Sequence, residues 1–519
     1  MFQTFDIENL FFFIHNQVME KKTRECGVLL HPVSLPSHWG IGDIGENAFR
    51  FVDKLKNAGV RLWQVLPLGP TGFGDSPYAA RSTFAGNELL ISMESLYENG
   101  YLELVDILNV HLDTDRVDYG QVKEFKMPLL RKAAQTFLAK PPKEYRKFCN
   151  AKAWWLDDYA LYQVLCAYYN DSRWFSQWPE ELKVRDKTAL DKARNEFSDE
   201  IELYKVYQYF FFSQWAELKE YANENGIRII GDIPIFVAPD SVDAWTNTKL
   251  LKIDENGMQE ASSGVPPDAF SATGQLWGNP LYRWEEHEKT GFAWWISRLR
   301  ETLSLCDIVR IDHFRGFAAC WEIPAGETTA MNGKWVPSPG RELLAAFRKE
   351  FGDDLPIIAE DLGVITPDVE ALRDENNLPG MKILQFAFSV DERDGEIDAA
   401  NAYLPHNVDE NSVIYTGTHD NDTTLGWYKS QSDKMKDIVR RYFECSDEDI
   451  VYRFIRAALS SRSRYAVIPF QDVLGLDSDA RMNVPSTCGT SNWSWKMSQG
   501  MLDDDNFGRL RYYIRMYNR

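Results

Sequence analysis

Short hydrophobic runs, rich in β-branched residues and followed by loop residues, recur along the chain. Eight of them have the length and composition of buried strands. The expected strands are residues 27–31, 61–66, 228–232, 307–312, 356–360, 381–386, 412–417 and 465–469. Most intervals between them contain amphipathic helical patterns, for example residues 47–58, 211–224, 291–305, 341–350 and 367–373. Such alternation is typical of parallel βαβ units, so the sequence predicts an α/β fold, specifically a (β/α)8 TIM barrel.

Two intervals between the expected strands are too long to be simple loops. Residues 84–205 are rich in Leu, Lys, Glu and aromatic residues at helical spacing, which predicts a mostly helical insertion subdomain. Residues 239–284 carry many Pro, Gly, Asn and Ser residues, so we expect loops there rather than regular structure, covering a cleft. The length of 519 residues fits one elaborated catalytic barrel over residues 24–519, preceded by an N-terminal extension of residues 1–23.

The composition narrows the classes of partner and compartment. A formal net charge of -21 would repel polyanions, so we expect no nucleic-acid partner. The apolar run 10–14 is too short for a membrane span and lacks the flanks of a targeting signal, so we interpret it as a docking tail. Seven scattered cysteines without paired spacing predict reduced thiols in the cytoplasm.

Three of the expected strands lead into carboxylates. Asp312, Glu360 and Asp420 each close a run of apolar, strand-like residues. A parallel barrel collects residues from successive strand ends around one pocket. Acids gathered in one pocket carry out proton transfer and nucleophilic chemistry, so these three are the candidate catalytic residues.

The surroundings of the three acids predict different roles in a retaining glycoside reaction, which uses two carboxyl groups about 5–5.5 Å apart. Arg310 precedes Asp312 by two residues, so both side chains can share one face of a strand and the guanidinium would keep a nucleophilic carboxylate ionised. Glu360 follows three apolar residues, which favours a protonated acid that then acts as a base. His419 and Asp420 can together hold adjacent sugar hydroxyls in the transition state.

Each acid also has a structural alternative. A carboxylate at a strand end is commonly a helix cap or half of an ion pair, but three of them flanked by His or Arg favour a catalytic site. Asp361 should face away from Glu360, and we interpret it as structural support. His31, His38 and His287 have no partners at ligand spacing, so we expect hydrogen-bonded structural histidines and no metal site.

Motifs spread from residue 27 nearly to the C-terminus carry a family resemblance. The runs are residues 27–32, 63–72, 75–78, 231–237, 274–282, 309–317, 359–363, 404–407, 415–423 and 481–485. Together, and in this order, they resemble the 4-α-glucanotransferases of the amylomaltase, or disproportionating enzyme, family. The combination is highly specific, whereas any single run would be modest support.

The resemblance implies a cytoplasmic (β/α)8 enzyme of carbohydrate metabolism, without calcium or another cofactor. Such an enzyme cleaves an α-1,4-glucan and transfers the donor segment to the 4-hydroxyl of glucose or another maltodextrin. By position, Asp312 matches the nucleophile, Glu360 the acid/base and Asp420 the transition-state stabiliser. Positions expected to contact sugar are Tyr78, Asp232, Asp268, Gln275, Trp277, Arg310, His313, His419 and Asn483. We expect glucan partners, no membrane, and a monomer or homodimer.

The chain departs from the family pattern in several places. Ala269 stands where the family often has a second aromatic residue, which should weaken stacking in the loop over the cleft. Ser486 precedes Thr487 where glycine is more usual, and the segment 388–405 is longer and more acidic than usual. Residues 1–23 lie outside the resemblance.

Transfer and hydrolysis differ in whether a sugar hydroxyl or a water molecule attacks the glycosyl-enzyme intermediate. Loop aromatics such as Trp245, Phe270 and Trp277 are candidates to stack on an acceptor sugar and favour it over water, although most aromatic residues should be core. Two other functions stay open at this point. One is an α-glucan hydrolase with the same three acids, and the other is a carbohydrate-binding protein with an inactive site.

Overall fold

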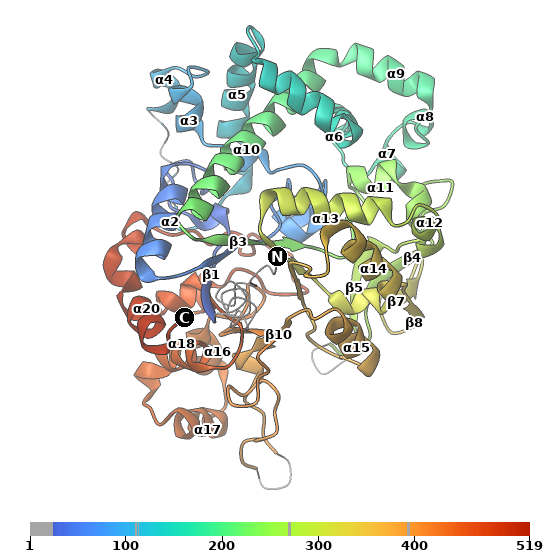
Figure 1. Ribbon diagram of the computed structural model, residues 1–519. Helices are drawn as coiled ribbons and strands as arrows, with labels where there is room; N and C mark the ends of the chain where they lie inside the picture. The colour runs from blue at the N-terminus through green and yellow to red at the C-terminus, as the bar shows by residue number, and fades with distance from the viewer. Residues whose placement is uncertain (1–23, 109, 111, 113, 268–270, 392–394) are drawn as a thin grey trace, which may run out of the picture.

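Eight parallel strands close into a barrel (Figure 1). The computed structural model describes residues 24–519 apart from 109, 111, 113, 268–270 and 392–394. The barrel strands are β1 (Glu25–Leu29), β2 (Leu62–Gln64), β3 (Arg228–Ile233), β6 (Ile308–Ile311), β9 (Ile357–Ala359), β10 (Gly380–Ile383), β11 (Ser412–Tyr415) and β12 (Tyr465–Pro469). Each pairs in parallel with the next, and β12 pairs with β1. Each also overlaps one predicted strand, so the TIM-barrel prediction is confirmed.

Alternate residues of each strand point to opposite sides of the barrel wall. One buried cluster takes a side chain from every barrel strand. Its strand members are Leu29, Leu62, Ile230, Ile308, Ile358, Met381, Ile383, Val413, Tyr415, Tyr465 and Val467. Their neighbours in sequence, such as Val28, Ile229, Val309 and Ile357, belong to the outer core under the helices. The period of two therefore fills the barrel interior with one set of residues and anchors the helices with the other.

Amphipathic helices cover the outside of the barrel. They include α2 (Glu46–Ala58), α10 (Ser198–Glu224), α13 (Ala293–Leu305), α14 (Gly340–Phe351), α15 (Pro367–Glu375), α16 (Thr424–Ser430), α17 (Asp433–Phe443), α18 (Ile450–Ser460), α19 (Phe470–Val473) and α20 (Asp504–Tyr517). The five predicted helices overlap α2, α10, α13, α14 and α15. Helix α2 ends where Gly59 adopts a left-handed φ of 85°, which glycine accepts without steric cost.

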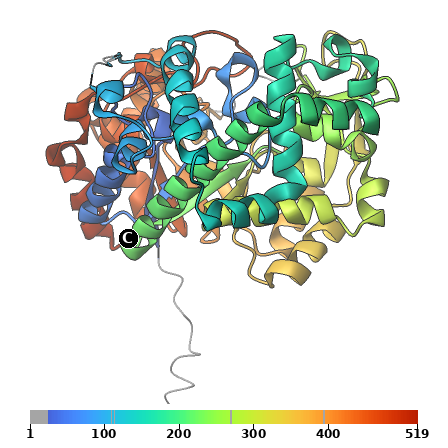
Figure 2. The ribbon, with the colours of Figure 1, turned by 90° about the horizontal axis from the view of Figure 1, so that it is seen from above.

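Between β2 and α10 the chain forms the helices of the predicted insertion. They are α3 (Met93–Glu98), α4 (Leu104–Ile107), α5 (Tyr119–Leu138), α6 (Lys143–Tyr169), α7 (Trp174–Gln177), α8 (Glu180–Lys183) and α9 (Lys187–Glu196). These helices lie together at the top of Figure 1, and Figure 2 shows α6 and α10 crossing the molecule as two long helices. Gln208 of α10 joins them to the segment after β2, because its amide accepts from Gly86 N (2.8 Å) and donates to Gly86 O (2.9 Å).

The prediction of loops throughout residues 239–284 is wrong. This interval contains α11 (Val242–Thr246), β4 (Ala261–Val265) and β5 (Gln275–Pro280), and α12 (Trp284–Lys289) begins at its last residue. A four-stranded antiparallel sheet has the order β5-β4-β7-β8, with β7 (Ala319–Pro324) and β8 (Lys334–Pro337) supplied from beyond β6. Strand β4 forms here because it pairs with β7, a partner about 60 residues later in the chain that a local pattern does not reveal.

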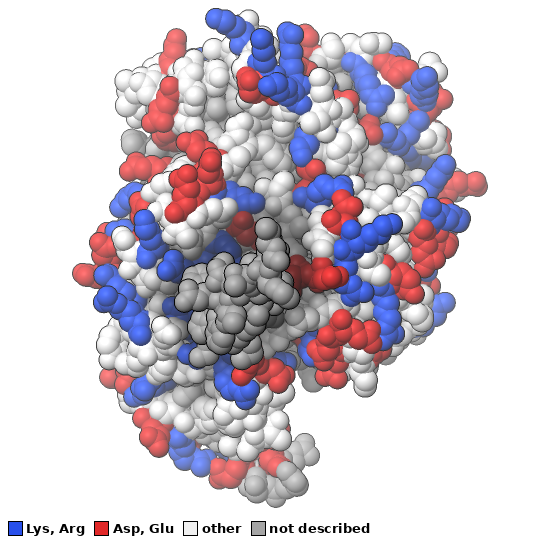
Figure 3. All heavy atoms as spheres, in the orientation of Figure 1, with Lys and Arg blue, Asp and Glu red and all other residues white. Residues whose placement is uncertain are grey.

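The surface carries both signs of charge. Figure 3 shows acidic and basic side chains interspersed over the face in view rather than gathered into one field. In the described part of the chain, the structure contains no helix with the length and apolar character needed to span a membrane.

We predict that Gly86→Ala destabilises the protein by about 1–3 kcal/mol, because a Cβ there would lie 1.9 Å from the Phe211 ring and must force α10 away. The matched control is Gly489→Ala, whose added Cβ would meet nothing within 4 Å. Denaturant unfolding measures the effect. Equal unfolding midpoints for the two variants would contradict this account of how the insertion packs.

Candidate active site

Four polar residues, Asp232, Arg310, Asp312 and Glu360, replace the apolar interior at the carboxyl ends of β3, β6 and β9. Asp232 follows the inward-facing Ile230 by two residues, and Arg310 follows Ile308 by two. Asp312 continues the same face one step beyond β6. Because the strand period is two, these side chains must point into the mouth of the barrel above its apolar filling.

Arg310 joins two carboxylates at this mouth. Its Nη1 donates to both oxygens of Asp232, at 2.9 and 2.7 Å, and its Nη2 donates to Asp312 Oδ1 at 2.8 Å. Arg310 and Asp232 are buried, whereas the Asp312 side chain keeps 29% of its surface exposed. The buried pair thus holds an accessible carboxylate at a fixed place, with one of its oxygens bonded to the cation.

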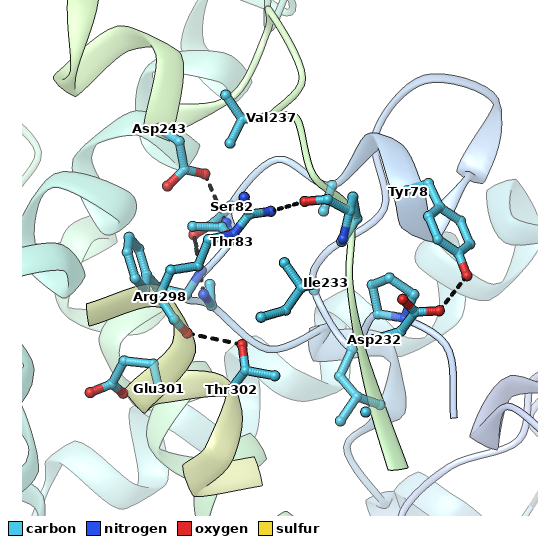
Figure 4. Close-up of a pocket in the computed structure, with 18 of the residues that line it drawn as sticks. Tyr78, Ser82, Thr83, Asp232, Ile233, Val237, Asp243, Arg298, Glu301 and Thr302 are labelled. Atoms are coloured by element: carbon cyan, nitrogen blue, oxygen red, sulfur yellow. Dashed lines mark hydrogen bonds between the residues drawn. The ribbon is translucent and has the colours of Figure 1, made fainter. Parts of the chain in front are cut away.

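Tyr78 extends the network from the segment after β2. Its hydroxyl donates to Asp232 Oδ2 at 2.6 Å, and the side chain points at that carboxylate in Figure 4. The ring also stacks on His419, with centroids 5.0 Å apart and planes 13° apart. Tyr78 therefore connects the residues at the end of β3 with those that follow β11.

Glu360 lies at the end of β9, directly beside the end of β6. The register pairs Ile311 with Ala359, so Asp312 and Glu360 are the next residues on two adjacent strands. Glu360 Oε2 accepts from the backbone N–H of His313 at 2.6 Å, and Oε1 accepts from that of Leu362 at 3.0 Å. The first bond ties the carboxyl group of Glu360 to the residue that follows Asp312.

Burial raises the pKa of Glu360 to about 8. The Arg310 charge opposes this shift, and the Asp312 carboxylate adds to it. At neutral pH Glu360 is therefore protonated, beside a carboxylate that is ion-paired. The environment of Glu360 is suited to proton donation, and that of the neighbouring Asp312 is suited to nucleophilic attack.

The third acid follows β11 on a loop. Asp420 Oδ1 accepts from the Asn483 amide at 2.7 Å, and Oδ2 lies 3.4 Å from His419 Nε2. Arg481 donates to the backbone oxygens of Asp420 (2.6 Å) and Asn483 (2.7 Å). The Asp420 side chain is 44% exposed, so its carboxylate is held in place and still faces the open space above the barrel.

The antiparallel sheet brings an aromatic side chain to the same region. The Trp277 ring of β5 meets His313 edge to face at 4.8 Å, and Trp277 Nε1 donates to Gln275 Oε1 at 3.2 Å. His313 adopts a left-handed φ of 49°, which turns the chain sharply after Asp312. Of the nine residues predicted to contact sugar, Asp268 lies outside the described residues, and the contacts join the other eight to the three acids.

Several residues with predicted structural roles lie where the sequence indicated. Asp361 is buried on the outer face of the barrel, paired with Arg373 and accepting from Met381 N at 2.7 Å. His31 accepts from Leu66 N at 3.3 Å, and His287 lies 3.2 Å from Leu250 O. In the ranges that the structure describes, His, Cys, Asp and Glu side chains form no group of three or more suited to a metal ion.

The prediction that Trp245 lines the cleft is wrong. Trp245 is completely buried, and its indole N–H donates to Leu182 O at 2.9 Å, so it packs the insertion rather than lining a cleft. Phe270 lies outside the described residues. The Pro, Gly, Asn and Ser content of residues 239–284 predicts a loop position for Trp245, but α11 turns the ring inward against the insertion.

Sequence reasoning missed residues that support the site from a distance. Arg481 stands two residues before Asn483, and this spacing was the available signal for its role. The Trp493 ring lies 5.7 Å from Tyr78 and 5.9 Å from His419, and Met381 Sδ accepts from Arg310 Nε at 3.4 Å. The contacts of Trp493 and Met381 join distant segments and leave no local pattern in the chain.

Comparison with known proteins finds close similarity over nearly the whole chain. A sequence profile described as 4-alpha-glucanotransferase matches residues 30–502. The 4-alpha-glucanotransferase of Synechocystis is 47% identical over 505 residues, covering 96% of this chain and 98% of the relative. The enzyme of that name from Thermus thermophilus is 47% identical over 500 residues, covering 94% and 97%. The solved amylomaltase from Streptococcus agalactiae, in complex with acarbose, gives a TM-score of 0.91 at 38% identity, covering 96% of this chain and 99% of that one.

We predict that Arg310→Met lowers the free energy of unfolding by about 3–5 kcal/mol, because the Asp232 carboxylate would stay buried without its cation. Arg341→Met is the control, since it removes an exposed arginine from its 2.8 Å pair with Glu375 and should change stability little. Chemical denaturation of both variants measures the difference. A loss for Arg310→Met no larger than that of the control would contradict the role given to this buried ion pair.

Proposed function

The chain belongs to the 4-alpha-glucanotransferase family, and we propose that Asp312, Glu360 and Asp420 carry out the transglycosylation reaction of this enzyme. It is an enzyme that moves glucan segments, so its substrates are glucans. The observation that carries the residue assignment is the juxtaposition of an ion-paired Asp312 with a protonated Glu360 on adjacent strand ends. The proposed chemistry is a retaining double displacement.

In the first step Asp312 attacks the anomeric carbon of the donor glucan. The carboxylate is partly exposed and bonded to Arg310 through Oδ1, which leaves Oδ2 to form the glycosyl ester. Arg310 is itself fixed by its two bonds to buried Asp232, so little reorganisation accompanies the attack. Glu360 gives its proton to the departing glycosidic oxygen as the C–O bond breaks.

Glu360 then changes from acid to base. The Asp312 charge contributes to the raised pKa of Glu360, and formation of the ester removes that charge. The pKa of Glu360 should therefore fall in the intermediate, while the Arg310 cation remains and stabilises the carboxylate form. Glu360 is then suited to take the proton from the 4-hydroxyl of an acceptor glucose or maltodextrin as that oxygen displaces Asp312.

Asp420 is proposed to stabilise the transition state. Its carboxylate is oriented by Asn483 and His419 and remains accessible to sugar hydroxyls. Hydrogen bonds to those hydroxyls strengthen as the ring flattens and positive charge develops, so they favour the transition state over the ground state. Arg481 positions this group by donating to the backbone carbonyls of both Asp420 and Asn483.

The residues around the acids are proposed to bind the central sugars. Tyr78, Asp232, Arg310, His313, His419, Gln275, Trp277 and Asn483 form this set, and Asp268 stays a prediction from the sequence. Trp277 is 37% exposed and stands beside His313, so its ring can stack on the apolar face of an acceptor sugar. A bound acceptor places a hydroxyl where water would otherwise attack, which favours transfer.

The domain organisation and setting are also proposals. The catalytic barrel of residues 24–519 would be interrupted by the insertion of residues 84–205 and by the cleft-covering segment of residues 239–284, with residues 1–23 as an N-terminal extension. All seven cysteines are free thiols, in agreement with a reducing cytoplasm. A monomer or homodimer is expected, and sedimentation of the full chain decides between them.

Incubation with maltotriose tests transfer against hydrolysis. Transfer should yield glucose together with a ladder of longer oligosaccharides, while the total number of reducing ends stays constant. Chromatography of the products and a reducing-end assay measure the two quantities. A steady rise in reducing ends would show that water is the main acceptor, and unchanged maltotriose would favour a binding protein with an inactive site.

Replacing Glu360 with Gln should lower turnover of maltodextrin by about 10²–10⁴-fold or more, while binding is retained, because the amide cannot donate a proton. In the unmodified enzyme, the first chemical step should decline as pH rises through about 8, since Glu360 then loses the proton that it must donate. Single-turnover kinetics across pH measures this limb. An unchanged rate in the Gln variant, or the same alkaline limb in both proteins, would refute the assignment.

A further inference from the structure

A small cavity lies beside the loop that carries Asp420. It is lined by residues at or just beyond the carboxyl ends of β1, β2, β11 and β12, and both His31 and His419 contribute to it. Its volume of about 30 Å³ exceeds the roughly 10–15 Å³ that one water molecule requires. Sites for organic ligands are about ten times larger, at about 300–1,000 Å³. The cavity therefore suits water and no larger molecule.

The two ring nitrogens of His419 have different surroundings. Nε2 lies 3.4 Å from Asp420 Oδ2, and the side chain as a whole is only 4% exposed. In the part of the chain that the structure describes, Nδ1 is buried and has no hydrogen-bond partner. Because Nε2 faces a carboxylate, the ring hydrogen belongs on Nε2, which leaves Nδ1 as an acceptor. Burying an acceptor without a donor destabilises the fold, so a donor to Nδ1 is expected.

His31 is the second histidine of the cavity, and it has a hydrogen to donate. Its Nδ1 accepts from the backbone N–H of Leu66 at 3.3 Å. Burial lowers the pKa of His31 to about 3, and the nearby His419 adds to this shift, so the ring is neutral near pH 7. A neutral imidazole that accepts at Nδ1 carries its hydrogen on Nε2. His31 therefore has an N–H to give, while His419 has a nitrogen that must accept.

One water molecule in the cavity can join the two rings. Among the described residues His419 Nδ1 has no partner, so His31 does not bond it directly. A water accepts from His31 Nε2–H and donates to His419 Nδ1. Gln471 also lines the cavity, and its amide N–H donates to Ala480 O at 3.3 Å, which leaves its side-chain oxygen to accept the second water hydrogen. Three contacts are typical of a buried water.

We propose that His31 is a positioning residue, which fixes the tautomer and the orientation of His419 through this buried water. The His419 ring stacks on Tyr78 with centroids 5.0 Å apart, and its Nε2 faces Asp420. With the hydrogen held on Nε2, His419 donates toward the carboxylate and toward sugar hydroxyls. With the hydrogen on Nδ1, a bare nitrogen would face the carboxylate and repel it.

The expected effect on catalysis rests on the proposed role of Asp420, whereas the water and the tautomer are present without turnover. A crystal structure of the unmodified chain, at a resolution that shows buried water, tests the contact directly. We expect one water within hydrogen-bond distance of His31 Nε2 and His419 Nδ1. A cavity without water would overturn the proposal.

Nitrogen-15 NMR of the eight histidines reports the tautomer. The His419 signals are assigned by their loss in His419→Gln. They should show a bare Nδ1 and a hydrogen-bearing Nε2 in the unmodified chain. A hydrogen on His419 Nδ1 would contradict the proposal.

Two variants separate the roles of the two nitrogens of His31. His31→Asn keeps an acceptor near the Nδ1 position for Leu66 N but removes the donor at Nε2, whereas His31→Gln keeps a donor near Nε2. His31→Asn should shift the His419 signals and lower kcat/KM for maltotriose about 2–10-fold, the effect of one neutral hydrogen bond. His31→Gln should retain both. The alkaline limb that Glu360 sets should stay in place in both variants.

The matched control is His287→Asn, which removes another buried histidine, on α12, whose Nε2 lies 3.2 Å from Leu250 O. It should leave the His419 signals and kcat/KM unchanged. Thermal melting confirms that each variant is folded, and the unmodified crystal structure decides the question if His31→Asn unfolds. Unchanged His419 signals in His31→Asn would overturn the proposal. Activity that does not depend on Asp420 would instead refute the assignment of that residue and leave the water and the tautomer in place.

Discussion

The buried ion pair of Arg310 with Asp232 is the constraint on which the catalytic centre depends. Burying the Arg310 guanidinium below the barrel mouth would cost free energy without carboxylates beside it. Asp232 of β3 and Asp312 at the end of β6 supply those carboxylates. The same cation fixes Asp312 and acts on Glu360. One interaction therefore sets the position of the proposed nucleophile and moderates the protonation of the proposed acid. Burying the Arg310 charge is therefore tied to the arrangement of Asp312 and Glu360.

The barrel wall supplies two of the acids, and the connecting segments complete the centre. Tyr78 arrives on the segment after β2, Trp277 on the antiparallel sheet, and Asn483 with Arg481 from beyond β12. The reacting groups therefore stand on the rigid barrel wall, and the residues proposed to recognise glucan stand on the connecting segments. The strand ends hold the proposed reacting groups in register, while the segments add the side chains proposed to bind sugar and exclude water.

Much of this arrangement was predictable from the chain because it follows from local patterns. The eight strands appear as β-branched runs, and the period of two places Arg310 and Asp312 inward and Asp361 outward. The errors arise where pairing is not local. Strand β4 exists because β7, which follows β6 in the sequence, lies beside it, and the buried position of Trp245 depends on α11 packing against the insertion. The contacts of Trp493 likewise join segments hundreds of residues apart, so no spacing in the sequence encodes them.

The central claim is that Asp312 forms a covalent bond to the donor sugar, while Glu360 donates the proton in the first step and accepts one in the second. Trapping the intermediate tests this most directly. A glycosyl fluoride carries its own leaving group, so Glu360→Gln should still be glycosylated but should release the sugar slowly to an acceptor. Peptide mass spectrometry after rapid denaturation should then find one glycosyl unit on Asp312. A label on another residue, or no covalent adduct under conditions in which the fluoride is consumed, would contradict the account.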